Sequence, residues 1–350
     1  MSTTFGIFDH IEDLPGTPTD RLFRERLELI RLADAAGFRA YHLAEHHGSD
    51  LCLAPNQELF IAAAAQVTER IRLGPMVKLL PLHHPVRILE DMCVADQLTR
   101  GRLDFGVGRG VAPIEHAWFS SSWTESRERF EDALRIICRA LATGEITSEG
   151  STYWSFPPVP LATKPFQDRI PFWYPGNPAI AGRYGMSLMW AGPIDPTAYE
   201  VYVEAWNEHR GGDLRFDGPE SRPRVGCTML IGIGPREEGL DIARRAMNGL
   251  IRRTQNVHRN DLLIMSEEES YAAQAPLRAI LEHIEDAIAA GAGTPDEIAE
   301  RWAGFLAPGL IDYIALQVPA GDMTLDEARR ALEVFAAEVK PQLEKASLAA

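Results

Sequence analysis

Cysteine is scarce in this sequence and follows no metal-binding or redox pattern. The 350 residues include four cysteines, which are Cys52, Cys93, Cys138 and Cys227. No two of them form a Cys-X-X-Cys pair, so the sequence predicts neither a disulfide framework nor a zinc ribbon. We expect buried thiols in a reducing cytoplasm.

Positive charge and long apolar runs are also lacking. Lysine and arginine number 35 against 50 aspartates and glutamates, which gives a formal charge of −15. Nucleic acids and anionic membranes attract basic surfaces, so neither partner is expected. No stretch approaches the roughly 20 apolar residues of a membrane helix, and no signal peptide is visible. The sequence therefore predicts a cytoplasmic protein.

A glycine-rich nucleotide-binding turn is missing as well. In a doubly wound α/β sheet, Gly-X-Gly-X-X-Gly usually follows the first strand, and here none follows Phe8. The segment Gly106-Val-Gly108-Arg-Gly110 has a different spacing and lies much later in the chain. This disfavours the doubly wound sheet as an alternative architecture.

Apolar runs alternate with helical patterns along the chain. Eight runs predict strands, at residues 5–8, 40–44, 72–80, 103–107, 171–174, 187–191, 225–233 and 313–318. Between them, apolar residues recur at the spacing of amphipathic helices. Without a Pro/Gly/Ser-rich linker, these pairs predict one α/β domain over residues 1–350, a (β/α)8 TIM barrel with loop insertions. The insertions are expected at about 145–170 and 254–276, the second as a lid or an ordinary loop.

Polar or flexible residues follow four consecutive predicted strands. They are Glu45-His46-His47, residues 80–85 (Leu-Pro-Leu-His-His-Pro), Gly108-Arg109-Gly110 and Gly176-Asn177. Because the loops after the strands form the active site of a barrel, these strand ends predict one rim. A histidine there can exchange protons near neutral pH; a hydrogen bond that only holds a loop is the alternative for each.

Two arginines indicate an anion site on this rim. Arg109 lies between two glycines that would let the backbone approach a ligand. Arg127 is expected at the start of the next helix, where free N–H groups favour an anion. Phosphate is the natural ligand for such a pair. The alternative for Arg127 is a surface ion pair with Glu131, four residues further on.

Histidine pairs also raise the question of a metal. The sequence contains His46-His47 and His83-His84. Adjacent histidines rarely bind one ion together, and neither His-X-His after the first strand nor His-Glu-X-X-His is present. We therefore predict no metal.

Several of these segments closely resemble the bacterial luciferase-like monooxygenase family. The resemblance is ordered and strong over about residues 5–145, and weaker through 170–192, 293–296 and the last strand. It is carried by Ala44-Glu-His-His47, Leu73-Gly-Pro-Met-Val77, His84-Pro-Val-Arg87 with Glu90-Asp91, Asp96-Gln-Leu, and Gly101-Arg-Leu-Asp-Phe-Gly-Val-Gly-Arg-Gly110.

The resemblance implies an FMNH2-dependent monooxygenase. Such an enzyme takes reduced FMN from a separate flavin reductase and uses O2 to oxygenate a small apolar organic substrate, such as an aldehyde, ketone, alkane or sulfonate. The family also implies a homodimer formed through the second and third helices, where Ala62 to Ala65 would allow close approach. The particular substrate does not follow from the resemblance.

The resemblance also assigns roles to residues of the rim. His46 matches the catalytic histidine, with Glu45 and His47 as its neighbours in the flavin pocket. The cofactor would be bound by Met76 and Val77, joined by a cis peptide beneath the flavin ring, and at its phosphate by Arg109, Arg127, Gly176 and Asn177.

Two departures from the family pattern stand out. The loop after the fifth strand has Gly176-Asn177-Pro178 in place of a hydroxyl-rich run, which weakens the expectation of phosphate contacts there. Lys78 replaces a commonly apolar residue and is expected to reach the substrate, an acidic partner or the surface.

Three other functions remain as alternatives. The same superfamily contains coenzyme F420-dependent hydride-transfer enzymes and a non-catalytic flavin-binding partner subunit. A metal hydrolase can also be built on this barrel. The Glu45-His46-His47 segment favours the FMN branch, and the retention of His46 with both arginines argues against the non-catalytic role.

Overall fold

A ring of parallel strands forms the centre of the computed structural model, which describes residues 3–218 and 221–349. The strands pair in the order β3-β2-β1-β13-β10-β9-β8-β5-β4. The two-residue strand β4 continues β3 beyond Met76 and Val77, so one chain segment pairs with β2 on one side and β5 on the other. The ring therefore closes, which confirms the predicted (β/α)8 barrel.

The observed strands match the predicted ones closely. They are β1 (Thr4–Asp9), β2 (Ala40–Leu43), β3 (Arg72–Pro75), β4 (Lys78–Leu79), β5 (Phe105–Gly108), β8 (Phe172–Tyr174), β9 (Ser187–Ala191), β10 (Val225–Leu230) and β13 (Tyr313–Gln317). Two two-residue ribbons accompany the barrel, β6 (Glu145–Ile146) with β7 (Val159–Pro160), and β11 (Gly232–Ile233) with β12 (Ala292–Gly293). Residues 145–170 are otherwise irregular.

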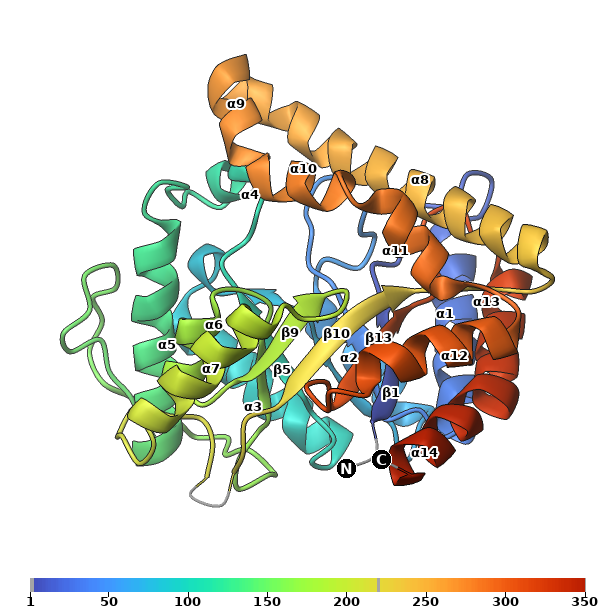
Figure 1. Cartoon of the computed structure of the whole chain (residues 1–350). Coiled ribbons are helices and arrows are strands. Elements are labelled where there is room, and N and C mark those ends of the chain that lie inside the picture. The colour runs from blue at the N-terminus through green and yellow to red at the C-terminus, as the bar shows by residue number, and fades with distance from the viewer. Residues whose placement is uncertain (1–2, 219–220, 350) are drawn as a thin grey trace.

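Helices surround the ring in the order expected from the sequence (Figure 1). Their starts are well specified: Asn177 and Asp195 cap helices with a proline in the first turn, and Thr294 and Thr324 form capping boxes. The helices are α1 (Thr19–Ala35), α2 (Gln57–Gln66), α3 (Pro85–Thr99), α5 (Ser126–Thr143), α6 (Pro178–Arg183), α7 (Pro196–Glu208), α12 (Pro295–Leu306), α13 (Leu325–Val334) and α14 (Lys340–Ala349).

Apolar side chains fill both faces of the ring. The larger cluster lies between strands and helices and includes Phe5 and Ile7 of β1. A smaller cluster fills the barrel interior with Met76, Trp173 and Tyr313, against which Phe8 packs. Alternation along β1 therefore places Phe8 on the inner face, which forms the floor of the cavity described below.

Residues 254–276 are helical, so the predicted loop is wrong there. The chain continues through α8 (Arg236–Arg259), the short 3-10 turn η2 (Asn260–Leu263), α9 (Glu267–Ala273), α10 (Ala275–Leu281) and α11 (Ile284–Gly291). In Figure 1 this extension crosses the end of the barrel opposite the two termini, with α4 (Pro113–Trp118) beside it. A capping box of Ser266 and Glu269 starts α9, and Val257 packs on Ile114. The high charge of this stretch conceals its helical period.

Two predicted absences can be compared with the structure. All four cysteines are free and buried, as predicted. Among the helices that the structure describes, none is both long and apolar enough to cross a membrane.

Candidate active site

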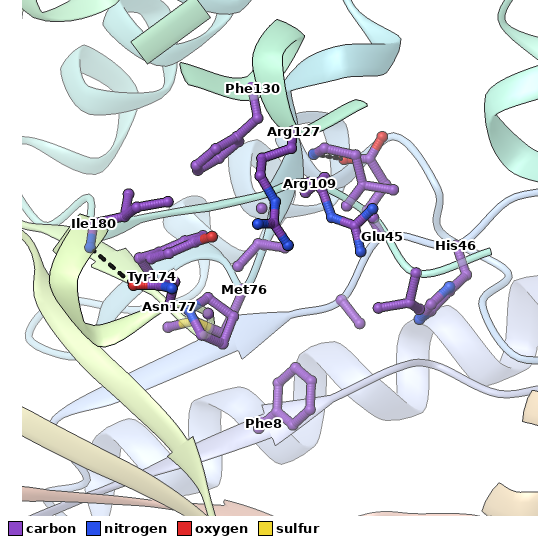
Figure 2. Close-up of a pocket in the computed structure, with 18 of the residues that line it drawn as sticks. Phe8, Glu45, His46, Met76, Arg109, Arg127, Phe130, Tyr174, Asn177 and Ile180 are labelled. Atoms are coloured by element: carbon purple, nitrogen blue, oxygen red, sulfur yellow. Dashed lines mark hydrogen bonds between the residues drawn. The ribbon is translucent and has the colours of Figure 1, made fainter. Parts of the chain in front are cut away.

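A cavity of about 380 Å³ opens at the C-terminal ends of the strands. Its wall combines an apolar surface with a pair of arginines and with His46, which lies to one side of them (Figure 2). The apolar part includes Phe8, Ala44, Met76, Val77, Leu79, Phe130 and Ile180. Three of the four predicted strand ends line the cavity, with Glu45-His46, Gly108-Arg109-Gly110 and Gly176-Asn177, whereas residues 80–85 and His47 do not.

Arg109 and Arg127 form the arginine end. Figure 2 shows both guanidinium groups pointing into the cavity, between His46 on one side and Tyr174 on the other. Arg109 donates to Ser126 Oγ at 3.0 Å and lies 4.3 Å from the Trp123 ring. Burial, and then the neighbouring positive charge of Arg127, lower the pKa of Arg109. Two adjacent cations in one cavity favour an anionic ligand.

Neither arginine has an acidic partner in the described part of the chain. The alternative of an ion pair between Arg127 and Glu131 is wrong, because Glu131 Oε2 lies 3.5 Å from Arg183 Nη1 instead. Arg127 is an exposed residue whose positive charge no carboxylate neutralises in residues 3–218 and 221–349. This end of the cavity is therefore suited to phosphate.

Backbone features shape the wall of the cavity. The peptide bond between Met76 and Val77 is cis, as predicted. A Cβ atom on Gly108 would lie 2.2 Å from Val77 Cγ2, so glycine is needed there for packing, and Gly108 also lines the cavity. Gly110 has a φ of +88°, a conformation that favours glycine.

Gly176 and Asn177 stand beside the arginine end, in the cavity wall. A Cβ atom on Gly176 would lie 2.2 Å from Tyr174 Cζ, so glycine allows the tyrosine ring to lie close to the backbone. Asn177 Oδ1 accepts hydrogen bonds from the backbone N–H groups of Ala179 and Ile180, at 2.9 and 3.3 Å. Its oxygen therefore caps α6 and orients this loop.

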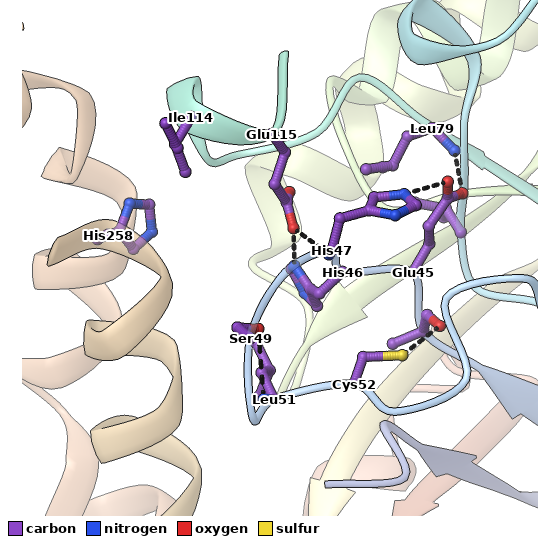
Figure 3. Close-up of polar contacts among 12 residues, drawn as sticks. Glu45, His46, His47, Ser49, Leu51, Cys52, Leu79, Ile114, Glu115 and His258 are labelled. Atoms are coloured by element: carbon purple, nitrogen blue, oxygen red, sulfur yellow. Dashed lines mark hydrogen bonds and ion pairs between the residues drawn. The ribbon is translucent and has the colours of Figure 1, made fainter. Parts of the chain in front are cut away.

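His46 and Glu115 form a pair to one side of the arginines (Figure 3). His46 Nδ1 lies 3.1 Å from Glu115 Oε1, which also accepts from the backbone N–H of His47 at 2.8 Å. Burial lowers the pKa of His46, but the Glu115 carboxylate outweighs it, and the net shift is upward. Since Nδ1 donates to Glu115, Nε2 is the ring nitrogen left for chemistry in the cavity.

The extension of the barrel holds the helix that carries Glu115. Asp261 of η2 accepts from the backbone N–H of Ile114 at 2.9 Å and from His258 at 2.9 Å. Asp261 and Glu115 are both fully buried. The segment expected to be a lid or a loop thus fixes the partner of His46.

Glu45 and His47 belong to a separate cluster beside the cavity. Glu45 accepts from His47 Nε2 at 2.9 Å, His83 Nε2 at 2.5 Å and the backbone N–H of Leu79 at 2.8 Å. Burial raises the pKa of Glu45, but Lys78 and the two histidines lower it well below its ordinary value. Glu45 is therefore a buried anion whose oxygens are already engaged. Glu45 lines the cavity, whereas His47 lies behind its wall.

Glu45, His47 and His83 form the group, among the residues that the structure describes, whose ligand atoms lie close enough together to bind a metal ion. Metal bonds of about 2.0–2.2 Å would keep ligand atoms roughly 3.3 Å apart in a tetrahedral site. The separations of 2.9 and 2.5 Å are those of direct hydrogen bonds. The absence of a metal thus stays a prediction, and the geometry describes a hydrogen-bonded cluster.

Lys78 binds an acidic partner, one of the three outcomes considered for it. Its ammonium lies 3.0 Å from Glu58 Oε2 of α2, and its side chain is buried. Burial lowers the pKa of Lys78, but Glu45 and Glu58 raise it above the usual value. Lys78 thus keeps its charge and supports the Glu45 anion from behind the cavity.

Three polar residues of the site were not predicted from the sequence. His10 follows β1 directly and would have been found by applying the strand-end rule to the first strand. Tyr174 ends β8 and reads as a core aromatic in the sequence. Glu115 lies in a six-residue helix with no periodic signal, so only the fold reveals it.

The chain thus forms a (β/α)8 barrel with a cavity at the C-terminal ends of its strands. The family profile of luciferase-like monooxygenases matches residues 3–310. The chain belongs to this family.

Three curated relatives show how far the similarity extends. Protein y4wF of Sinorhizobium fredii is 37% identical over 67% of this chain and 68% of its own length. Limonene 1,2-monooxygenase of Rhodococcus erythropolis is 33% identical over 51% of this chain and 47% of its own. The oxygenase component of flavin-dependent trigonelline monooxygenase of Acinetobacter baylyi is 29% identical over 57% and 51%. The chain spans about half the length of these last two relatives.

Solved structures share the fold over nearly the whole chain. Monooxygenase RslO1 of Streptomyces bottropensis has a TM-score of 0.80 at 24% identity, covering 97% of this chain and 99% of its own. The oxygenating constituent of 3,6-diketocamphane monooxygenase of Pseudomonas putida, in complex with FMN, scores 0.76 at 23%, covering 97% and 98%. An F420-dependent secondary alcohol dehydrogenase scores 0.70 at 18%, covering 98% and 99%. At these identities the likeness shows the fold alone.

Proposed function

We propose that this chain is the oxygenase of a two-component monooxygenase. It would take reduced FMN from a separate flavin reductase and use O2 to oxygenate a small apolar organic substrate. The relatives named as a limonene monooxygenase and as the oxygenase component of a flavin-dependent monooxygenase support this function. The observation that carries it is a cavity that holds an unneutralised arginine pair and, to one side of it, the His46–Glu115 pair.

The residues present fit FMN. The phosphate would be held by Arg109 and Arg127, which lack an acidic partner in residues 3–218 and 221–349. The flavin ring would lie in the apolar part of the cavity, which Met76 and Val77 help to form. When bound, reduced FMN supplies the electrons for the activation of O2.

His46 would donate and accept a proton in the reaction. Glu115 holds Nδ1 and favours the imidazolium, so Nε2 can donate a proton into the cavity and take it back. The apolar wall and the extension over the rim would limit the access of water to this proton. Glu45 and His47 would hold the wall of the cavity in position and take no part in the chemistry, since Glu45 is hydrogen-bonded to His47 and His83.

Coenzyme F420 is the second candidate cofactor, because an F420-dependent dehydrogenase shares the fold. A parallel titration of FMN and F420, followed by fluorescence, separates the two. We expect FMN to bind and Arg109→Ala to weaken it. Binding of F420 with no binding of FMN would overturn the oxygenase proposal.

A non-catalytic flavin-binding subunit remains the third candidate. The intact His46–Glu115 pair in the cavity favours an enzyme over that role. Oxygen consumption with FMN, NADH and a generic flavin reductase, screened over aldehydes, ketones and sulfonates, tests it. Flavin binding without product formation from any of these substrates would favour the accessory role.

We further propose a homodimer formed through α2 and α3. Leu59 of α2 is 71% exposed, and Val94 and Leu98 of α3 are 46% and 43% exposed. These two helices pack together, so their exposed apolar residues can form a continuous surface. Sedimentation equilibrium should give a dimer that Leu59→Asp dissociates; a monomeric wild type would contradict the proposal.

A further inference from the structure

His10 is a cavity residue that the proposed reaction has not yet used. It follows β1 and lines the same cavity as His46. Its ring lies 4.8 Å from the Phe8 ring and 5.9 Å from the His46 ring, nearly parallel to the latter at 18°. Two aromatic neighbours therefore hold the imidazole in place.

The backbone around His10 is fixed as well. The buried carboxylate of Asp9 accepts from the backbone N–H of Ile11 and from the Tyr41 hydroxyl, both at 2.8 Å. The same carboxylate lies 3.0 Å from Arg26 Nε. Because the residues on both sides of His10 are tied to this network, its ring is presented to the cavity in a preorganised position.

Neither ring nitrogen of His10 has a hydrogen-bond partner among the residues that the structure describes. Burial, and then the proximity of His46, lower the pKa of His10 to about 3. The ring is therefore neutral at physiological pH and offers one N–H donor and one acceptor. His10 is half-buried in the cavity wall, so either a ligand in the cavity or solvent water can supply this partner.

The neighbourhood of His10 narrows the chemistry of that ligand. Phe8 lies against His10, Ala44, Met76 and Val77 line the same cavity, and the arginines of the cavity are those assigned to phosphate. A ligand next to His10 thus needs an apolar body and one uncharged acceptor. A carbonyl oxygen meets this requirement, whereas a hydrocarbon leaves the N–H group unsatisfied.

We propose that His10 donates a hydrogen bond to the carbonyl oxygen of the substrate and so selects ketones and aldehydes over hydrocarbons of the same shape. This inference rests on the proposed oxygenase function and specifies its substrate class. An N–H group aimed at that oxygen would also favour negative charge on it during attack at the carbonyl carbon.

A matched pair of probes tests the inference by binding alone. Cyclohexanone and methylenecyclohexane have nearly the same shape and differ in the carbonyl oxygen. Titration into the FMN-loaded protein, followed by NMR, should show about three- to tenfold tighter binding of the ketone, the ratio expected for one hydrogen bond. Equal affinities in the wild type would overturn the inference.

Two variants attribute the preference to His10. His10→Phe keeps a ring without a donor and should bind both probes equally, while His10→Gln keeps an N–H group and should retain part of the ketone preference. A full preference in His10→Phe would contradict the assignment. If His10→Phe does not fold, the ring-nitrogen signals of wild-type His10 decide: they must shift with cyclohexanone only.

The outcome separates this inference from the oxygenase proposal. A ketone preference that depends on His10, without oxygenation of any substrate, would leave the carbonyl site in place and remove the oxygenase function. Oxygenation of hydrocarbons with no ketone preference would support the oxygenase function and overturn the carbonyl site at His10.

Discussion

Glu45 and His46 are adjacent in the chain, yet their side chains belong to different networks. Glu45 accepts three hydrogen bonds from the strand ends around it, and its charge is balanced by Lys78. His46 has one carboxylate partner on α4 and a second nitrogen left for the cavity. Glu45, whose oxygens all accept hydrogen bonds, therefore stabilises the rim, whereas His46 keeps a ring nitrogen that is available for chemistry.

The two networks are also supported differently. The Glu45 cluster is formed by residues of β4 and of the segments that directly follow β2 and β4. The His46 pair depends on α4, which Asp261 of the extension holds. The position of the His46–Glu115 pair therefore depends on the helices that cross the end of the barrel, whereas the Glu45 cluster depends on the barrel itself.

Replacing His46 should have the largest effect, and that effect should be on turnover. His46→Ala removes the proton donor and should lower the rate of oxygenation by about 10²–10⁴-fold. Binding of FMN should stay measurable, because the arginine end is untouched. Steady-state assays together with FMN titration check this; unchanged turnover would remove His46 from the mechanism.

Replacing Glu45 should affect stability before turnover. Glu45→Ala leaves His47 and His83 without their carboxylate and removes one of the negative charges near the buried Lys78, so it should cost about 3–5 kcal/mol of the free energy of unfolding. Glu45→Gln keeps the shape and isolates the charge. Denaturant unfolding measures both variants. A Glu45→Ala protein as stable as the wild type, but inactive, would reverse the roles that we assign to Glu45 and His46.

The arginine end offers a matched comparison of two cations. Arg127→Ala should weaken FMN binding by about 10- to 100-fold, the value of a charge-assisted contact. Arg183→Ala removes a nearby arginine that is already paired with Glu131 and should leave the affinity within about twofold. Fluorescence titration measures both. Equal losses in the two variants would argue for a general effect of charge and against a phosphate site.

Glu115→Gln should give the smallest effect, and one that depends on pH. Glu115 raises the pKa of His46, so the pair stabilises the fold fully below the unfolded pKa of about 6.5. That contribution is lost as the pH rises through the higher folded pKa. The stability gap between wild type and Glu115→Gln, about 1–2 kcal/mol at pH 6, should therefore shrink toward pH 9. A gap that widens with pH would contradict the pairing.

The strands could be predicted because parallel strands of a barrel are buried on both faces and so form apolar runs. The rim followed from the rule that strand ends carry the site, which found Glu45, His46, Arg109 and Gly176. The family resemblance added Met76 and Val77, whose peptide bond no local pattern marks as cis.

Other features could not be predicted, because they depend on contacts between distant segments. His46 and Glu115 are 69 residues apart in the sequence, and Asp261 and Ile114, which form a hydrogen bond, are 147 residues apart. The helices in 254–276 were missed because many charged residues conceal the buried face of the segment. The pairing of Glu131 with Arg183 instead of Arg127 follows from how α5 and α6 are placed.

The most direct test of the central claim is a single-turnover reaction with photoreduced FMN and ¹⁸O2, which needs no reductase. The wild type should place one labelled oxygen atom in the product of a ketone or aldehyde, and His46→Ala should bind FMN but incorporate no label. A wild type that incorporates no label with any substrate, or a His46→Ala variant that equals it, would contradict the account.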